Sequence, residues 1–532
     1  MDYNSLIYRY PSQRRVVYGK KGMVATSQPL AAQAGLEILK RGGNAIDAAI
    51  GTAACLTVVE PTSNGVGGDA FSIVWHKGKI YGLNSSGATP KKLSIKEIKN
   101  RGYNEMPIYG FLPVTVPGVP YAWSELSQKF GKLPLKEVLE PAISYALEGF
   151  PVSPIVSQNW EESLNKYKKS LKGEEYKHWF ETFTINGSAP KPGEVWYNKD
   201  LGRTLLELGE SNCNSFYNGN IAEKIESYSI KYNGYIRGED LRDFKSEWVT
   251  PLKVNYRGYD VWELPPNTHG LVVLLALNIL NNFELKDEPL SHHKIIEALK
   301  LAYVDGLEFI TDFNKMSMSV EELLSKEYSR QRSKLIIDKA VEPKHGNPNL
   351  GGTVYLATAD GEGNMVSYIQ SNFMGFGSGL VVPGTGISLH NRGCTFSLDP
   401  NKANSLEPGK KTYHTIIPGF LSKDNLPIGP FGVMGAYMQP QGHVQVVTDM
   451  IDFKHNPQEA LDRPRWQWIN GKAVELEPQF YDDITKVLIK CGHDIKYSKD
   501  IGSFGRGQII LRENETLIGA TEPRADGIVA AW

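Results

Sequence analysis

The sequence predicts a layered α/β fold, and two observations support this class. Segments with helical periodicity and segments with strand alternation occur along the whole chain, and short strands separated by Gly, Asn and Pro dominate from Thr353 onward. Helices that flank sheets drawn from both halves of a chain are typical of a layered body. Hydrophobic residues make up 41% and charged residues 22%, which excludes collagen-like and wholly disordered proteins.

The first 90 residues predict two helices followed by a strand pair. Ser27 is the expected N-cap of the first helix, with Pro29 in its first turn and two glycines after Arg41 as its end. The next stretch, 44–61, is apolar nearly all round and therefore predicts a buried helix. Two short strands are expected around the His-Lys-Gly turn at 76–78.

The later elements follow from the same patterns. Residues 118–246 are mostly helical, and a strand pair is expected at 252–264. Two helices follow at about 270–281 and 292–311, and the charged stretch 325–352 ends as a loop. Within the strand-rich region after Thr353 we expect two helices, near residues 441–451 and 481–491.

Charge and cysteine content exclude several classes of protein. Lys and Arg total 58 against 59 acidic residues, a net charge of -1. The overall charge therefore does not favour binding to nucleic acid or to an anionic membrane. The chain shows no signal peptide and no apolar run long enough to span a bilayer, and a cytoplasmic protein is therefore expected. Four distant cysteines without a CxxC pair fit neither a disulfide framework nor structural zinc.

No cofactor and no metal ion are expected. His292, His293 and His414 are the candidate metal ligands, but the sequence offers them no histidine or carboxylate partner at ligand spacing. The candidate chemistry therefore has to come from ordinary side chains.

Residues 351–371 predict a β-hairpin that brings two hydroxyl groups together. A Gly-Glu-Gly loop joins Asp360 to Asn364, and the register continued from this loop puts Thr353 across from Ser371. Thr353 is either an ordinary strand threonine or an N-terminal nucleophile. Such a nucleophile cleaves the peptide bond in front of itself, and its freed amine then activates its hydroxyl. The pattern alone does not decide between the two.

Four blocks of sequence resemble the γ-glutamyltranspeptidase family, which includes cephalosporin-type acylases. The blocks are GMVATSQPLAAQAGLEILKRGGNAIDAAIGTAACLTVVEPTSNGVGGDAF, VPGVPYAW with FGKLPLKEVLEPAISYALEGFPVS, YRGYDVWELPPNTHGLVVLLALNIL, and LIGATEPRADGIVAAW. The resemblance implies an N-terminal-nucleophile hydrolase, a four-layer αββα sandwich that cuts itself between Gly352 and Thr353. The portions 1–352 and 353–532 would share one core and stay together as a heterodimer, and further oligomerisation is left open.

The resemblance also assigns roles in catalysis. Thr353 corresponds to the nucleophile, and Ser371 occupies the position of a Thr that hydrogen-bonds it. Gly435 and Ala436 fall in the loop whose backbone N–H groups form the oxyanion hole, a role that needs no side chain.

The residues implied in substrate binding depart from the family pattern. His414 and Thr415 stand where the family has two Ser residues that contact the substrate carboxylate. Arg392 takes a Gln position, Thr395 takes an Asp position, and Phe373 replaces Asn or Glu.

Two further departures lie at Ser86 and Val354. The family's carboxylate-binding Arg corresponds to Ser86, and the nearby Lys91 and Lys92 cannot reproduce the bidentate fork of an Arg. Val354 replaces a second Thr beside the nucleophile. Relative to the family, the pocket thus loses one Arg at Ser86, loses one Asp at Thr395 and gains Arg392, a net change of +1. This change suits an acidic acyl group without a free α-amine, unless Arg392 simply pairs with a neighbouring carboxylate.

The resemblance thus implies a self-cleaving N-terminal-threonine amidohydrolase or acyltransferase that cleaves γ-glutamyl amides such as glutathione through an acyl-enzyme. One alternative is an acylase on glutaryl or other non-glutamyl amides, which the departures favour. A second alternative is a catalytically silent member that acts as a binding protein. The expected partner is a small-molecule amide, with no nucleic acid and no membrane.

Overall fold

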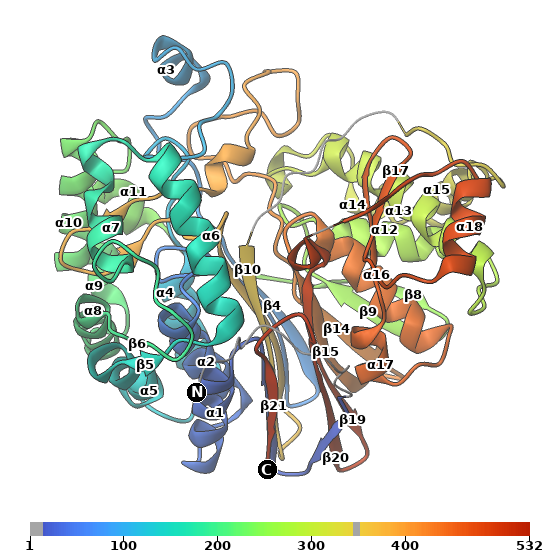
Figure 1. The fold of residues 1–532 in the computed structure, drawn as a ribbon, viewed down its shortest axis with the longest axis horizontal. Helices are drawn as coiled ribbons and strands as arrows, with labels where there is room; N and C mark the ends of the chain where they lie inside the picture. The colour runs from blue at the N-terminus through green and yellow to red at the C-terminus, as the bar shows by residue number, and fades with distance from the viewer. Residues whose placement is uncertain (1–13, 344–351, 499) are drawn as a thin grey trace.

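Two large antiparallel sheets face each other in the computed structural model, which describes residues 14–343, 352–498 and 500–532 (Figure 1). Within these ranges each sheet has seven strands. The strand order in the first sheet is β1 (Val17–Gly19), β20 (Thr516–Thr521), β19 (Arg506–Glu513), β15 (Leu426–Met434), β14 (Gly419–Lys423), β9 (Tyr259–Glu263) and β8 (Leu252–Tyr256). The order in the second is β21 (Ile528–Ala531), β2 (Gly22–Thr26), β10 (Gly352–Asp360), β11 (Met365–Phe373), β3 (Asp69–His76), β4 (Lys79–Ser85) and β7 (Glu247–Val249).

Apolar side chains of both sheets fill the space between them. Trp75 of β3 stacks on Phe420 of β14 with ring centroids 5.9 Å apart. Tyr355 of β10 lies against Gly432 of β15, where an added Cβ would come within 2.4 Å of the Tyr355 ring. Since side chains alternate between the two faces of a strand, each sheet keeps an outer apolar face that must also be covered.

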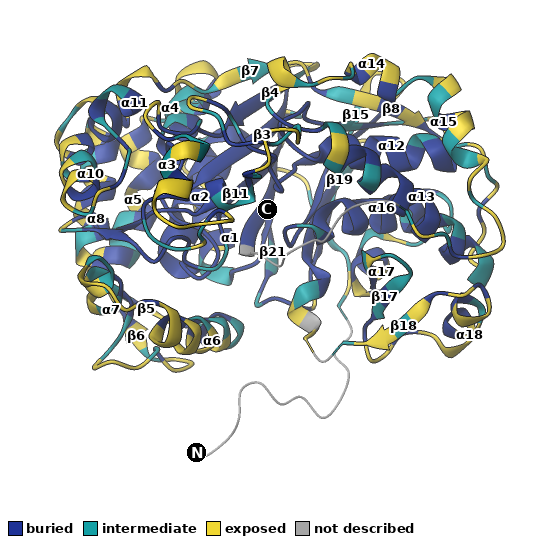
Figure 2. Cartoon of the chain, turned by 90° about the horizontal axis from the view of Figure 1, so that it is seen from above, coloured by how far each residue is buried: buried dark blue, intermediate teal, exposed yellow. Residues whose placement is uncertain are grey.

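Helices cover these outer faces, as Figures 1 and 2 show. The second sheet is covered by α1 (Pro29–Lys40), α2 (Ala45–Val59) and α4 (Val119–Phe130), with α5 (Leu135–Glu148) and α8 (Lys199–Glu210) outside them. The first sheet is covered by α12 (Gly270–Leu280) and α16 (Met438–Ile451), with α13 (Pro289–Phe309) against α12. Every residue of α2 is buried, as its sequence predicts. The predicted α/β class is confirmed.

Smaller elements complete the chain. The remaining helices are α3 (Ile95–Asn100), α6 (Pro154–Ser170), α7 (Lys177–Phe183), α9 (Asn214–Asn218), α10 (Asn220–Lys231), α11 (Gly238–Asp243), α14 (Val320–Leu323), α15 (Lys326–Ser333), α17 (Pro457–Asp462), α18 (Asp482–Lys490) and the 3₁₀ turns η1 (Glu174–Tyr176), η2 (Phe313–Lys315), η3 (Arg392–Thr395) and η4 (Ile501–Phe504). The remaining strands are β5 (Phe150–Pro151), β6 (Val195–Trp196), β12 (Val381–Val382), β13 (Ile387–Ser388), β16 (Trp466–Asn470), β17 (Ala473–Leu476) and β18 (Asp494–Tyr497). Among the helices of the described ranges, none has the length and apolar character needed to cross a membrane.

Most predicted elements are present, but the cap predicted for the first helix is wrong. Pro29 is the first residue of α1, and the side chain of Gln28 accepts the N–H groups of Leu30 and Ala31. Ser27 instead donates its hydroxyl to the carboxylate of Glu60 over 2.5 Å. A longer side chain one residue closer to the helix therefore takes the capping role.

Candidate active site

The candidate nucleophile lies at the start of β10, near the middle of the second sheet. Thr353 is 1% exposed, and its Oγ1 donates a hydrogen bond to Ser371 Oγ on β11 over 3.1 Å. From Val354 onward the ladder follows the predicted register. A bulge between Gly352 and Val354 shifts the pairing at the strand's first residues. The expected pair of hydroxyl groups is nevertheless formed.

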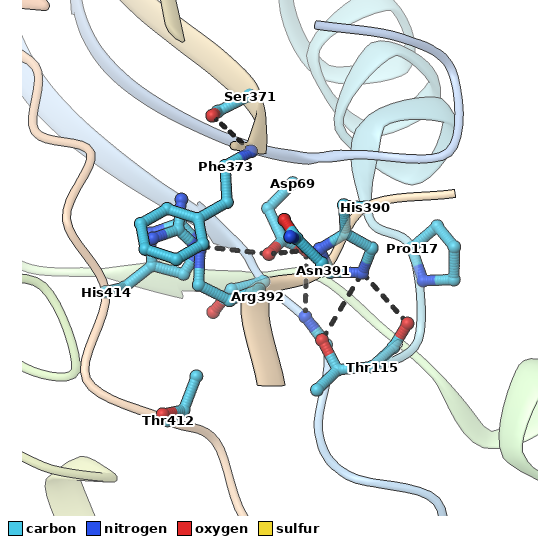
Figure 3. Close-up of polar contacts among 12 residues, drawn as sticks. Asp69, Thr115, Pro117, Ser371, Phe373, His390, Asn391, Arg392, Thr412 and His414 are labelled. Carbon is cyan, nitrogen blue, oxygen red and sulfur yellow. Dashed lines mark hydrogen bonds and ion pairs between the residues drawn. The ribbon is translucent and has the colours of Figure 1, made fainter. Parts of the chain in front are cut away.

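Ser371 connects this pair to the next turn of the chain. Its Oγ also accepts the backbone N–H of Phe373 over 2.7 Å. Phe373 has a φ of 74°, a left-handed conformation that costs a residue with a side chain roughly 1–2 kcal/mol. The hydrogen bond helps to hold this turn, and the turn aims the Phe373 ring at Arg392 (Figure 3).

Arg392, the first residue of η3, is a buried cation with unused donors. It is 1% exposed, its Nη1 donates to Thr415 Oγ1 over 2.6 Å, and its Cζ lies 4.0 Å from the centroid of the Phe373 ring. Its Nε and Nη2 contact no hydrogen-bond acceptor in the described residues. Burial lowers the pKa of Arg392 to about 10, although the charge of Asp69 opposes this.

The alternative that Arg392 pairs with a carboxylate is therefore wrong. No carboxylate oxygen of the described residues lies within the 4.0 Å that defines an ion pair with it. Two nitrogen atoms of its guanidinium, Nε and Nη2, have no hydrogen-bond acceptor in the described residues.

Asp69 and two histidines form a buried network behind Arg392 (Figure 3). Asp69, on β3, is the ladder partner of Ser371, and its Oδ2 lies 2.9 Å from His414 Nε2 and 3.3 Å from His390 Nδ1. His390 Nε2 donates to the carbonyl of Thr115 over 2.9 Å. The expectation that His414 lacks a carboxylate partner is wrong, because Asp69 contacts it from 345 residues away in the sequence.

Burial and the contacts between these side chains together set the charges of the network. All three side chains are fully buried. Burial alone would raise the pKa of Asp69, but His390 and His414 hold it well below its usual range. Burial, followed by the charge of Arg392, lowers the pKa of His414 to about 3. Asp69 is therefore a carboxylate and His414 a neutral imidazole at neutral pH, and His414 faces Asp69.

A cavity of about 780 Å³ opens beside Phe373. Its lining includes Phe373, Thr395 and Tyr437. Thr395 Oγ1 donates to the carbonyl of Arg392 over 2.9 Å and lies 2.7 Å from Thr412 Oγ1. The structure thus brings the predicted substrate residues Phe373, Arg392, Thr395 and Thr415 into one region, next to the Thr353–Ser371 pair.

The predicted oxyanion residues follow β15, which crosses β10. Gly435 has a φ of 137° and Ala436 a φ of 48°, so the chain turns sharply here before α16 begins at Met438. Gly435 lines a second cavity of about 280 Å³ together with Met374, and Met374 also lines the first. The two cavities therefore meet at the segment that follows β11.

The position of the missing family Arg holds an amide network. Ser86 Oγ donates to Asn84 Oδ1 over 2.8 Å, and Asn267 Nδ2 donates to Ser86 Oγ over 3.2 Å. The nearby lysines point elsewhere, since Lys91 pairs with Asp243 and Lys92 lies 3.8 Å from Glu239. Within the described residues, Ser86 forms hydrogen bonds with Asn84 and Asn267 and with no arginine.

The sequence argument also missed partners of His293. Glu297 and His493 lie beside it, and the ligand atoms of the three lie within 4.8 Å of one another. The expectation that His293 lacks histidine and carboxylate partners is wrong.

Asp69 and His390 are the site residues that sequence reasoning did not single out. Asp69 begins a strand that is otherwise apolar up to His76 except for Ser72, and a carboxylate in such a strand is itself a signal of a buried partner. His390 has no comparable signal, because its partners come from residues 69 and 115.

The chain is similar to known proteins over nearly its whole length. The sequence model of the family described as Gamma-glutamyltranspeptidase matches residues 31–532. A glutathione hydrolase-like YwrD proenzyme of Bacillus subtilis is 35% identical over 96% of this chain and 98% of its own length. An oxamate amidohydrolase proenzyme of Klebsiella pneumoniae is 32% identical over 96% of this chain and 98% of its own. The crystal structure of a cephalosporin acylase from Bacillus halodurans superimposes with a TM-score of 0.98 at 56% identity, covering 100% of this chain and 99% of that one.

Proposed function

Because this chain belongs to the γ-glutamyltranspeptidase family, we propose that it cleaves itself before Thr353 and then hydrolyses or transfers the acyl group of small amides. The facing sheets with helices outside them would then be the four-layer sandwich of the N-terminal-nucleophile hydrolases. The portions 1–352 and 353–532 would be the two subunits of the mature enzyme. The hydrogen bond between Thr353 and Ser371 carries this proposal, and the proenzyme relatives support it.

Maturation begins with attack of Thr353 Oγ1 on the carbonyl carbon of Gly352. The C–N bond between the two residues breaks, an ester forms on Oγ1, and water hydrolyses this ester to leave a free carboxylate on Gly352. The α-amine of Thr353 is then available as a base. Ser371 orients the attacking hydroxyl in both steps.

Amide cleavage uses the same hydroxyl. The α-amine takes the proton of Oγ1 as Oγ1 attacks the substrate carbonyl, and the backbone N–H groups of Gly435 and Ala436 stabilise the developing oxyanion. The proton passes to the leaving amine as the C–N bond breaks. Water or another amine then releases the acyl group from Thr353.

We further propose that the acyl group carries a carboxylate and needs no α-amine. The free Nε and Nη2 of buried Arg392 support the first part, because a buried donor without an acceptor is costly until a ligand supplies one. Ser86 in place of the family Arg supports a changed orientation of that carboxylate. Oxamate is the monoamide of a dicarboxylic acid, so the relative that acts on it supports the same substrate class.

A set of three anilides tests this proposal. The mature protein is assayed with glutaryl, γ-glutamyl and butyryl p-nitroanilide, which differ in the carboxylate and the α-amine of the acyl group. We expect kcat/KM to be highest for the glutaryl compound. Arg392→Met should lower that value at least tenfold, since a hydrogen bond to a charged group contributes about 1.5–3 kcal/mol, and it should leave the butyryl rate little changed. An equal loss with butyryl anilide would contradict the role of Arg392.

The γ-glutamyl substrate remains the second candidate, because the glutathione hydrolase-like relative covers nearly the whole chain. Hydrolysis of only the γ-glutamyl anilide would favour it. Denaturing electrophoresis tests cleavage itself, because the 59.2 kDa chain should give fragments of about 39 and 20 kDa. Sequencing of the smaller fragment should begin at Thr353. An active preparation with an intact chain would rule out the mechanism, and an intact, inactive chain would favour a silent binding protein.

A further inference from the structure

A second polar cluster, on α13 and on the segment before β18, has the composition of a metal site. His293 and Glu297 lie one turn apart on α13, and His493 immediately precedes β18. These three side chains are at most 4% exposed. His293 Nδ1 lies 2.8 Å from His493 Nε2, and that atom lies 3.8 Å from Glu297 Oε1. The reaction proposed above uses none of them.

Backbone groups hold the outer atoms of two of these side chains. His293 Nε2 donates to the carbonyl of Ile337 over 2.7 Å, which leaves the Nδ1 lone pair directed at His493. Glu297 Oε2 accepts the N–H of Val341 over 3.1 Å, which leaves Oε1 on the inner side. Metal-binding histidines and carboxylates in proteins are oriented in this way by contacts to their other polar atom.

The distances fit a small tetrahedral ion after a modest adjustment. Bonds of about 2.0–2.1 Å to nitrogen and oxygen require donor atoms roughly 3.3 Å apart. The two separations observed, 2.8 and 3.8 Å, lie on either side of that value. The proton that His493 shares with His293 can move to His493 Nδ1, a buried atom with no partner in the described residues. His493 would then bind through Nε2 as a neutral imidazole.

We propose that His293, Glu297 and His493 bind one Zn²⁺ ion, with water in the fourth position. Two imidazoles and one carboxylate are ligands that suit this ion. His293 and Glu297 precede Thr353 in the chain and His493 follows it. If the chain is cleaved before Thr353, the ion joins the two fragments, a consequence that rests on the proposed function, whereas the binding itself does not.

Lys300 competes with the ion for Glu297. Its Nζ lies 2.6 Å from Glu297 Oε1, and the side chain is 1% exposed. Bound zinc has to displace this ammonium from the inner oxygen, which lowers the affinity of the site. Glu342 also attracts Lys300 and offers it an alternative partner. Lys300→Met, which keeps an unbranched chain without the charge, should therefore bind zinc more tightly than the wild type.

Metal analysis of the full chain tests the proposal. Protein freed of any purification tag is stripped with a chelator, equilibrated with Zn²⁺ or Co²⁺, and passed through a desalting column. We expect one zinc per chain, visible absorption typical of tetrahedral Co²⁺, and a rise in Tm on adding zinc. His493→Gln should lose the stoichiometric ion. His178→Gln is the matched control, because His178 is a surface histidine beside Glu181 outside the cluster, and it should keep the ion.

Three results would overturn the proposal. Wild-type protein that retains no stoichiometric zinc would do so without any variant, even if His493→Gln fails to fold. Zinc retained equally by His493→Gln would place the ion elsewhere. Zinc bound by Lys300→Met but not by the wild type would show that Lys300 fills the site in the native chain.

Discussion

Ser371→Ala tests whether the hydroxyl pair on β10 and β11 is a catalytic device or ordinary strand packing. Ser371 Oγ accepts Thr353 Oγ1 over 3.1 Å and the N–H of Phe373 over 2.7 Å. Removing this buried oxygen deprives the Phe373 N–H of its acceptor, at a cost of about 1–3 kcal/mol in the free energy of unfolding. The hydrogen bond from Thr353 contributes about 0.5–1.5 kcal/mol, so its loss should slow self-cleavage roughly 2- to 13-fold.

Ser367→Ala is the matched control on the same strand. Ser367 is fully buried on β11, and its Oγ lies 2.8 Å from the hydroxyl of Tyr355. This variant should lose a similar free energy of unfolding without slowing cleavage, because its partner is not the nucleophile. Cleavage is followed by electrophoresis after synthesis in a cell-free system, and stability by urea unfolding of a Thr353→Ala background that cannot cut itself.

The two variants separate the explanations of the hydroxyl pair. Slower cleavage in Ser371→Ala alone supports a role for Ser371 in orienting the nucleophile. Equal slowing in both would refute the reasoning, since it would show that any weakening of β11 delays the cut. Unchanged cleavage in Ser371→Ala would refute it as well.

Two further predictions concern the oxyanion turn and a buried acid. Ala436→Gly should keep wild-type kcat, because the role needs only the backbone N–H and glycine accepts a φ of 48°. Gly435→Ala should lower kcat at least tenfold. The φ of Gly435 is 137°, and the added Cβ would lie 3.0 Å from Gly505 Cα. A lower kcat for Ala436→Gly than for Gly435→Ala would contradict the assignment. Burial raises the pKa of Glu60 to about 7, against the charge of Arg506. Protonated Glu60 therefore stabilises the fold fully below its unfolded pKa near 4.5, and this contribution is lost as the pH rises through 7. The free energy of unfolding of Glu60→Gln, relative to the wild type, should rise by up to about 3 kcal/mol between pH 5 and pH 8. Urea unfolding at the two pH values measures this difference. An equal difference at both pH values would exclude this account.

Local patterns predicted the hairpin at the centre of the site because its information is local. The loop Gly361-Glu362-Gly363 fixes which residues face each other, and Gly363 takes a φ of 90°. The ladder from Val354 onward then follows by counting. The sequence did not predict the bulge between Gly352 and Val354, because a bulge depends on how the first residues of the strand pair with the rest of the sheet.

The buried polar networks could not be predicted in the same way. His414 contacts Asp69, which lies 345 residues away in the sequence. His293 contacts His493, which lies 200 residues away. Spacing rules detect partners only within one element or motif. Such pairs become visible once β3 and the segment around His414, or α13 and β18, are placed side by side by the fold.

The state of Arg392 is best explained by function, because stability gives no reason for it. A buried guanidinium usually stabilises a protein only when its donors are matched, and a buried charge with unmatched donors is costly. Arg524 shows the matched solution in this same chain, since its Nε and Nη2 pair with Glu477 and its Nη1 pairs with Glu522. Arg392 instead has Thr415 and the face of Phe373, with Asp69 beyond ion-pair distance. An anionic acyl group would supply the missing acceptor only while it is bound beside Thr353, so the cost paid in the free enzyme would become binding energy for the substrate.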